Sequence, residues 1–278
     1  DCFLGGLQCS QTGDAYSLGD ELSDVELAHM NYVFDYYQCK FVNSREAWDW
    51  FAGRRIEMTA ELARKFKIGY ADHSLGSNFP RSDRRRAEVI RGALQWLGIL
   101  KSTGNQLFHG DVIFPFLDEN EQIVGAYGRR ITPEKRPDRI YHHHWLAGKA
   151  TFFNRVALTK HNRIILCKSP VEALTLICSG IPNVIATMGI YSFDRVHLEE
   201  LAKFHPSEIV LAFDNSDAGN HMSGFIAMAL NYSNINCSRI QLPRNTDVNA
   251  FSKKARDPEN ELNDLILKTE EIDYTLNT

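Results

Sequence analysis

The chain has 278 residues, of which 44% are hydrophobic and 24% are charged, and its formal net charge is -4. This composition is that of an ordinary globular protein and excludes a disordered, fibrous or low-complexity chain. No apolar run approaches the roughly 20 residues that a membrane-spanning helix needs, so we expect no membrane partner. The length is sufficient for one large or two modest domains with their own hydrophobic cores.

The cysteines point to a reducing compartment. Six of them are scattered along the chain, and none forms a Cys-x-x-Cys pair, so we expect no zinc site. Cys167 and Cys178 lie in apolar segments, where they pack as small hydrophobic residues. Together with the lack of a recognisable signal peptide, this usage favours a cytoplasmic location.

Charge is unevenly distributed along the chain. A basic face for a polyanion and a mixed, evenly solvated surface explain this unevenness equally well. The basic residues form two clusters, Arg81, Arg84, Arg85, Arg86 and Arg91, and then Arg129, Arg130, Lys135, Arg136 and Arg139.

The first part of the chain predicts a mixed α and β lobe, which we place at residues 22–160. The preceding residues 1–21 are polar and glycine-rich, without a clear period. Helical spacing or helix-capping signals predict helices at 25–37, 44–51, 59–66 and 84–96, with an extended segment at 68–71. Residues 111–117 and 122–128 read as two strands around a turn at 118–121, which is a hairpin.

From residue 163 onward, short apolar strands alternate with helices, which predicts a parallel α/β domain at 161–250 with right-handed crossovers. The expected strands are 164–167, 184–186, 209–213 and 239–242, and the expected helices are 170–178, 193–204 and 217–232. A polar, helical tail at 251–278 follows. The expected fold class is therefore α/β: an α+β lobe followed by a parallel α/β domain.

Two strand ends carry the candidate chemistry. Asp214 directly follows one apolar strand, and Lys168 follows another. Because the carboxyl ends of parallel strands meet at one edge of a sheet, these side chains are expected to face a common site. Most proteins built in this way hold a divalent metal there, but Lys168 stands where such a site would have an acid.

Several short blocks occur in a specific order along the chain. They are Cys9-Ser-Gln-Thr-Gly-Asp-Ala15, Glu46-Ala-Trp-Asp-Trp-Phe-Ala-Gly-Arg-Arg-Ile56, Phe66-Lys-Ile-Gly-Tyr-Ala71, Phe114-Pro-Phe-Leu-Asp118 and Gly125-Ala-Tyr-Gly-Arg129. In order and spacing they resemble the polymerase core of bacterial-type DNA primases, including primase-like proteins of phages and mobile elements. The first block is similar to the end of that family's zinc-binding module without its ligands, and the α/β segment resembles a Toprim domain.

The resemblance implies a Mg²⁺ or Mn²⁺ site made of carboxylates, because Toprim enzymes act on phosphodiesters with such an ion. Matched to the family pattern, the first acid position is Lys168 and the next is Glu172. The Asp-x-Asp position retains Asp214 but has Ser216 as its second member. The last acidic segment retains Asp247, whereas its second position is Asn249. Asp217 is a possible substitute acid, one residue beyond Ser216.

The lysine works against metal binding. At ~4 Å and an effective dielectric constant near 20, one charge–charge interaction is worth about 4 kcal/mol, and exchanging a carboxylate for an ammonium reverses its sign. We expect Lys168 to pair with Asp214 or Glu172. The alternative is that Lys168 binds a nucleotide phosphate directly.

Simpler roles compete with each assignment. Glu172 closes a potential capping box with Ser169, and Ser216 or Asp217 suits a helix N-cap. Adjacent histidines at 142–144 are read as a solvated or nucleic-acid-facing loop rather than a metal site. Phe152, Phe153 and Trp145 are expected in the core or an interface rather than as stacking platforms. For nucleic-acid contact the candidates are Arg84, Arg85, Arg129, Arg130 and Arg139.

Two functions remain open at this point. One is a DNA primase that binds single-stranded DNA, polymerises ribonucleotides with Mg²⁺ or Mn²⁺ and works with a replicative helicase. The other is a binding module derived from a primase, without catalysis or metal, that retains a basic groove for single-stranded DNA or a replication partner. A nuclease or topoisomerase of the Toprim class is less favoured, because it would need the same acids.

Overall fold

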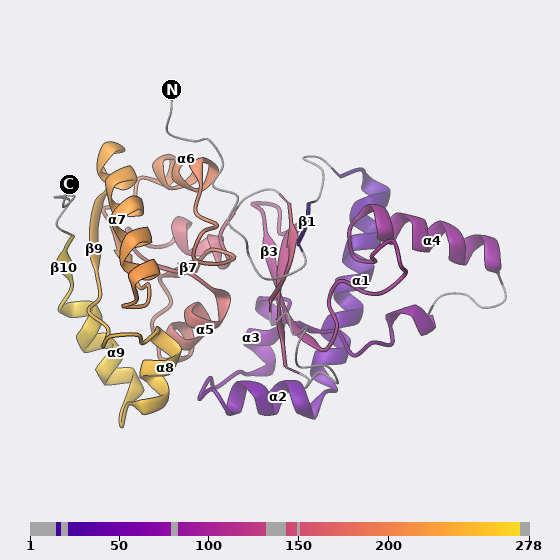
Figure 1. The fold of residues 1–278 in the computed structure, drawn as a ribbon, viewed down its shortest axis with the longest axis horizontal. Helices are drawn as coiled ribbons and strands as arrows, with labels where there is room; N and C mark the ends of the chain where they lie inside the picture. The colour runs from indigo at the N-terminus through magenta and orange to yellow at the C-terminus, as the bar shows by residue number, and fades with distance from the viewer. Residues whose placement is uncertain (1–14, 18–21, 79–82, 132–142, 149–150, 273–278) are drawn as a thin grey trace. The chain divides into compact units, whose positions relative to one another are not determined.

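A computed structural model describes residues 15–17, 22–78, 83–131, 143–148 and 151–272 (Figure 1). The chain forms two compact units. Of the described residues, the N-terminal unit comprises those within 15–53 and 58–148, and the C-terminal unit comprises 54–57 and 151–272. Residues 151–160, which we had expected in the first lobe, belong to the C-terminal unit, because Phe153 pairs with Ala186 in an isolated β-bridge.

The N-terminal unit combines helices with a five-stranded sheet. Its helices are α1 (Asp24–Val42), α2 (Arg45–Ala52), α3 (Ala60–Lys65) and α4 (Arg84–Trp96), with a short 3-10 turn, η1 (Leu75–Asn78). The strand order is β1 (Ala15–Ser17), β5 (His143–Ala147), β4 (Ile123–Arg130), β3 (Asp111–Leu117) and β2 (Gly69–Tyr70). The predicted hairpin is confirmed as β3 and β4, which pair antiparallel from Asp111↔Arg130 to Phe116↔Gly125.

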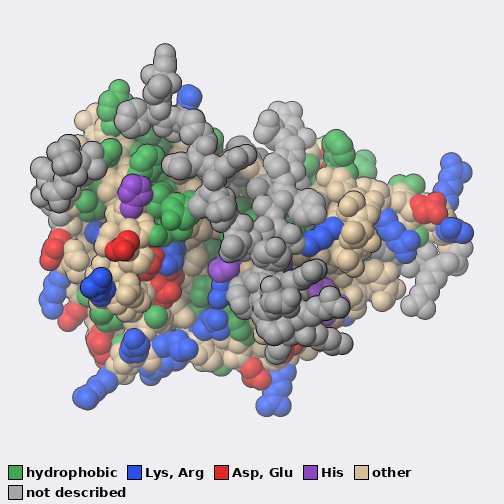
Figure 2. Space-filling view, viewed as in Figure 1, with side chains coloured by type: hydrophobic (Ala, Val, Ile, Leu, Met, Phe, Trp, Pro, Cys, Tyr) green, Lys and Arg blue, Asp and Glu red, His purple; other side chains and the backbone are tan. Residues whose placement is uncertain are grey.

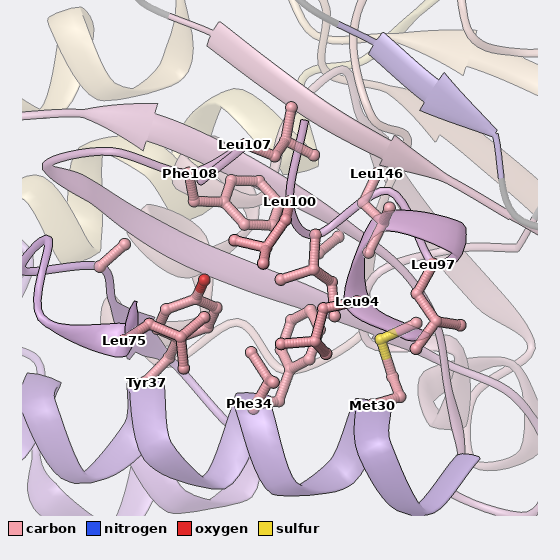
Figure 3. Packing of buried hydrophobic residues seen from close by; sticks show 14 of the residues in the cluster. Met30, Phe34, Tyr37, Leu75, Leu94, Leu97, Leu100, Leu107, Phe108 and Leu146 are labelled. Atoms are coloured by element: carbon pink, nitrogen blue, oxygen red, sulfur yellow. The ribbon is translucent and has the colours of Figure 1, made fainter. Parts of the chain in front are cut away.

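Helix α1 organises the core of this unit. It begins with a capping box between Ser23 and Glu26, and it extends well beyond the predicted end at residue 37. Met30, Phe34 and Tyr37 recur at helical spacing and point from α1 into the apolar cluster shown in Figure 3. Strand β2 lies so close to this helix that a Cβ at Gly69 would be 2.7 Å from Cβ of Tyr37. Only glycine fits there without displacing the strand.

The C-terminal unit is the predicted parallel α/β domain. Its strand order is β10 (Glu270–Glu271), β9 (Asn236–Arg239), β8 (Glu208–Leu211), β6 (Arg163–Cys167) and β7 (Val184–Ala186), with β10 antiparallel to β9 and the other pairs parallel. The helices are α5 (Pro170–Cys178), α6 (Arg195–Phe204), α7 (Asp217–Tyr232), α8 (Val248–Lys254) and α9 (Pro258–Leu267), preceded by the 3-10 helix η3 (Arg155–Thr159). The last predicted strand starts three residues early, because its register with β8 runs from Asn236 to Arg239.

Strands β6 and β8 are adjacent and almost fully buried. Ile164, Ile165, Leu166, Val210 and Leu211 are all 0% exposed, as expected for central strands covered on both faces. Because the two strands are paired in parallel, the residues that follow them lie at the same edge of the sheet. Among the described residues, no helix combines the length and apolar character needed to cross a membrane.

Candidate functional site

The carboxyl ends of β6 and β8 bring Lys168 and Asp214 together. The parallel register pairs Leu166 with Leu211, so the chain leaves both strands at the same level. Nζ of Lys168 then lies 2.5 Å from Oδ1 of Asp214. Their side chains are only 21% and 17% exposed, so this ion pair is largely shielded from water.

The second carboxylate oxygen of Asp214 is also engaged. The hydroxyl of Ser216 donates to Oδ2 at 2.6 Å, and the same hydroxyl accepts a hydrogen bond from the backbone N–H of Gly219 as the N-cap of α7. The turn between β8 and α7 is tight, since a Cβ on Gly219 would lie 1.9 Å from the carbonyl oxygen of Asp214. Both oxygens of this carboxylate are therefore occupied by side chains of the protein.

The surroundings of Lys168 and Asp214 keep both side chains charged. Burial alone would raise the pKa of Asp214, but the hydrogen bonds from Lys168 and Ser216 outweigh it and lower that pKa. Burial likewise opposes the charge on Lys168, yet Glu172 and Asp214 together raise its pKa. Lys168 is thus held as an ammonium and Asp214 as a carboxylate.

Glu172 is the third member of the site. It lies in the first turn of α5, with Oε1 3.5 Å from Nζ of Lys168 and its side chain 3% exposed. Neither of its oxygens has a hydrogen-bond partner within the described part of the chain. Burial raises the pKa of Glu172 to about 8, so its carboxyl is mostly protonated at neutral pH. The predicted capping box is wrong, because the Ser169 side chain caps nothing and Glu172 turns inward.

The remaining predicted site residues have local roles. Asp247 is the N-cap of α8 and accepts from the backbone N–H of Ala250 at 2.7 Å. Its charge contributes to the raised pKa of Glu172. Asn249 donates to the Thr175 hydroxyl and to the carbonyl of Arg54, which is a structural role. Asp217 begins α7 and is exposed.

The site does not fit a divalent metal. Among the residues that the structure describes, no group of three or more His, Cys, Asp or Glu side chains is arranged to hold an ion. An ammonium and a hydroxyl occupy the two oxygens of Asp214, and Glu172 is buried beside the same ammonium. Nζ of Lys168 thus lies directly beside the carboxylate of Asp214.

The predicted nucleic-acid residues are distributed over several elements of the N-terminal unit. Figure 2 shows Lys and Arg side chains gathered over α4, where Arg84 and Arg85 are exposed and Arg84 pairs with Glu88. Arg129 contacts the ring of His143 on β5. Arg130 is 9% exposed, with Nε 3.8 Å from Asp111, so it faces the interior. Arg139 lies outside the described residues, as does the segment 1–14.

Two features were not found from the sequence. Arg239 at the end of β9 donates to the carbonyl of Asp214, and burial lowers the pKa of its guanidinium. The expectation of a solvated histidine loop is wrong for the two described histidines, because His143 and His144 are in β5. His144 is 3% exposed and lies 2.9 Å from the fully buried carboxylate of Asp111. Phe152 and Phe153 are buried core residues, as predicted.

Comparison with known families agrees with this division of the chain. A family model described as "DNA primase catalytic core, N-terminal domain" matches residues 36–141, and one described as "Toprim-like" matches residues 165–252. The DNA primase of Aquifex aeolicus is 26% identical over 229 residues, which are 80% of this chain and 45% of that protein. The DNA primase of Campylobacter jejuni is 27% identical over 170 residues, 56% of this chain and 26% of that protein. The chain thus spans less than half the length of these curated relatives.

Solved structures give the same result for the fold. The zinc-binding and RNA polymerase domains of Aquifex aeolicus primase superpose with a TM-score of 0.72 at 23% identity, covering 91% of this chain and 63% of that one. A DnaG primase catalytic domain bound to single-stranded DNA superposes with a TM-score of 0.69 at 18% identity, covering 88% and 81%.

The C-terminal unit therefore has a Toprim-like fold, and the chain is a mixed α/β protein as the sequence predicted. With the N-terminal unit included, its architecture is that of a DnaG-like primase catalytic core, and its relatives in sequence and in fold are DNA primases.

Proposed function

We propose that this chain is a primase-type core that binds single-stranded DNA and in which Lys168 takes the place of a catalytic metal ion, so that primer synthesis by this chain is weak or absent. The observation that carries the proposal is the 2.5 Å contact between Nζ of Lys168 and Oδ1 of Asp214. Toprim primases use divalent metal ions, and here a tethered cation stands beside the acid that would bind one.

Electrostatic interactions favour the ammonium of Lys168 over a divalent metal ion as the partner of Asp214. Mg²⁺ prefers several oxygen ligands, at least some of them charged. Within about 4 Å of Lys168, a divalent ion would meet a repulsion that scales with twice the ~4 kcal/mol of a single charge pair. The buried, mostly neutral Glu172 offers little to offset this repulsion, so Asp214 and Lys168 form the favoured arrangement.

Binding of single-stranded DNA is supported by the fold and by exposed basic residues. One structural neighbour is a DnaG catalytic domain bound to single-stranded DNA. In this chain Arg84 and Arg85 are exposed, and Arg129 lies beside His143. We expect binding to weaken steeply with salt, because phosphate contacts release counterions. Binding that is independent of salt would contradict an electrostatic strand-binding surface.

An active primase is the alternative, favoured by the survival of Asp214 and Asp247 and by the conservative replacement at Glu172. It would take ribonucleotides and Mg²⁺ or Mn²⁺ and would work with a replicative helicase. We place either form in the reducing cytoplasm, since the four described cysteines are free thiols. A phage or mobile-element origin would suit a core whose acids have been replaced.

The test is a primer-synthesis assay on a single-stranded template with Mg²⁺ or Mn²⁺. Wild type is compared with Lys168→Glu/Ser216→Asp, which restores two acids, and with Lys203→Glu at an exposed position of α6. We expect little synthesis by the wild type and the control, and an increase of at least tenfold in the double variant. Robust synthesis by the wild type that is lost in Asp214→Asn would refute the proposal.

A further inference from the structure

A cleft in the N-terminal unit lies apart from the Toprim acids. Its volume is about 390 Å³, which is within the size range of small-molecule sites. Three segments line it: the chain after β2, the outer face of α4 and the loop between α4 and β3. Its basic side chains are His73, Arg91 and His109, and polar side chains such as Gln95, Thr103 and Asn105 complete the wall.

Strand pairing places the two histidines together. The end of β2 and the start of β3 lie side by side, with Tyr70 paired to Val112 and Gly110 donating to the carbonyl of Ala71. His73 follows the end of β2, and His109 precedes the start of β3. Their Nδ1 atoms are 2.5 Å apart, and their ring centroids are separated by 3.5 Å at an angle of 74°.

The contact defines which ring atoms can serve a ligand. One ring donates its Nδ1–H to the lone pair of the other Nδ1. Whichever ring accepts, its own proton must then be on Nε2, so the pair always presents an Nε2–H donor. The two imidazoles fix one another's orientation through this bond.

The backbone turn at residues 72–74 holds His73 in position beside His109. His73 has φ of 70°, a left-handed conformation that is uncommon for a residue other than glycine. Asp72 anchors the turn through Nζ of Lys40 at 2.9 Å and the backbone N–H of Ser74 at 3.1 Å. The Ser74 hydroxyl also donates to Oδ1 of Asp72, so this carboxylate is committed to three groups.

The opposite wall is tied to α4. Gln95 donates through Nε2 to the carbonyls of Lys101 and Ser102, at 3.3 and 3.4 Å. The N–H of Gly104 returns to the carbonyl of Lys101, closing a tight turn. Arg91, one turn before Gln95, lines the same cleft. None of the described residues lining it is Asp or Glu.

We propose that this cleft binds a terminal phosphate group, held by the guanidinium of Arg91 and the histidine pair of His73 and His109. A planar guanidinium suits phosphate because it can donate two parallel hydrogen bonds. The side chains that the structure describes in this lining include basic and no acidic ones, which favours an anion. A free nucleotide and the 5′-phosphate end of a nucleic-acid strand share this group.

The test uses the full chain in EDTA, so that no divalent ion contributes. Histidine ¹⁵N spectra are titrated with inorganic phosphate and with ATP. In parallel, fluorescence anisotropy compares a 5′-phosphorylated DNA 12-mer with its 5′-hydroxyl twin. Both DNA 12-mers can contact the proposed DNA-binding surface in the same way. Only the difference between their affinities therefore reports on the cleft. The variants are Arg91→Gln and His73→Asn. Asparagine is chosen at position 73 because it tolerates the left-handed conformation. The control is Arg45→Gln on α2.

We expect phosphate or ATP to shift the resonances of His73 and His109. Arg91→Gln and His73→Asn should each weaken this binding about tenfold. Arg45→Gln should change it less than twofold. ATP binding without a preference for the phosphorylated strand identifies a nucleotide, whereas that preference identifies a strand end. No shift with either probe overturns the proposal, as does equal binding by wild type and Arg91→Gln. Equal loss of both 12-mers in Arg91→Gln, without an effect on phosphate or ATP, also overturns it.

Discussion

The ammonium of Lys168 and the carboxylate of Asp214 lie 2.5 Å apart where two adjacent parallel strands end. The contact joins residues 46 positions apart in the chain, so it depends on the register of β6 and β8 rather than on local sequence. The pair balances the charge of Asp214 with a cation from the same unit.

Removing the ammonium should destabilise the chain. Lys168→Met keeps the length of the side chain but leaves Asp214 shielded from water without its cation. Breaking a fully buried pair costs about 3–5 kcal/mol, and the partial exposure here reduces our expectation to about 1–3 kcal/mol. Urea denaturation followed by circular dichroism measures the loss. Arg195→Met, which breaks the exposed pair with Glu199, should cost less than about 0.5 kcal/mol.

Glu172 should make stability depend on pH. Burial raises its pKa from 4.5 to about 8, so the folded chain binds an extra proton between these values. The free energy of unfolding therefore falls as pH rises through this window. Glu172→Gln should flatten the fall and raise stability at pH 8 by about 1–3 kcal/mol. Glu61→Gln, at an exposed position of α3, should leave the pH profile as it is; an unchanged profile for Glu172→Gln would contradict the assignment.

Gly219 should be essential for the turn that presents Asp214. A Cβ there would overlap the carbonyl oxygen of Asp214, and a backbone atom cannot swing away as a side chain can. Gly219→Ala should cost about 2–3 kcal/mol. In the same helix, a Cβ added to Gly224 would meet nothing within 4 Å among the described residues outside the helix's own backbone. Gly224→Ala should therefore stabilise the chain by about 0.5–1 kcal/mol. Equal effects of the two substitutions in thermal melts would count against this geometry.

The buried cluster of the N-terminal unit gives a further test. Asp111 accepts from the N–H of His109 and faces both His144 and Arg130. Asp111→Ala would remove the buried carboxylate that both groups face, at a cost of about 3 kcal/mol. Tryptophan fluorescence in urea follows this unit, because all four tryptophans, at 48, 50, 96 and 145, belong to it. Asp35→Ala on the exposed side of α1 should have little effect.

Local patterns were sufficient to predict much of the fold. Alternation of apolar strands and helices predicted the parallel domain, and the position of Asp214 and Lys168 after two such strands predicted their meeting. The hairpin of β3 and β4 followed from two apolar runs around a polar turn. In each case the information lies within a few adjacent residues.

What the sequence did not reveal depends on tertiary contacts. Ser169 and Glu172 have the spacing of a capping box, but burial beside Lys168 draws the glutamate inward. The histidines at 143 and 144 read as a loop because the carboxylate that pairs with His144 is Asp111, on a strand far away in sequence. Arg130 is likewise buried and Arg239 half-buried beside partners that no local pattern identifies.

Calorimetric titration with Mn²⁺ tests the central claim most directly, because it asks whether Lys168 occupies the position of an ion. The wild-type chain and the Lys168→Glu/Ser216→Asp variant are titrated under the same conditions, with Asp214→Asn as the control. We predict no saturable heat for the wild type and saturable binding by the double variant. Micromolar binding of Mn²⁺ by the wild type that disappears in Asp214→Asn would contradict the claim.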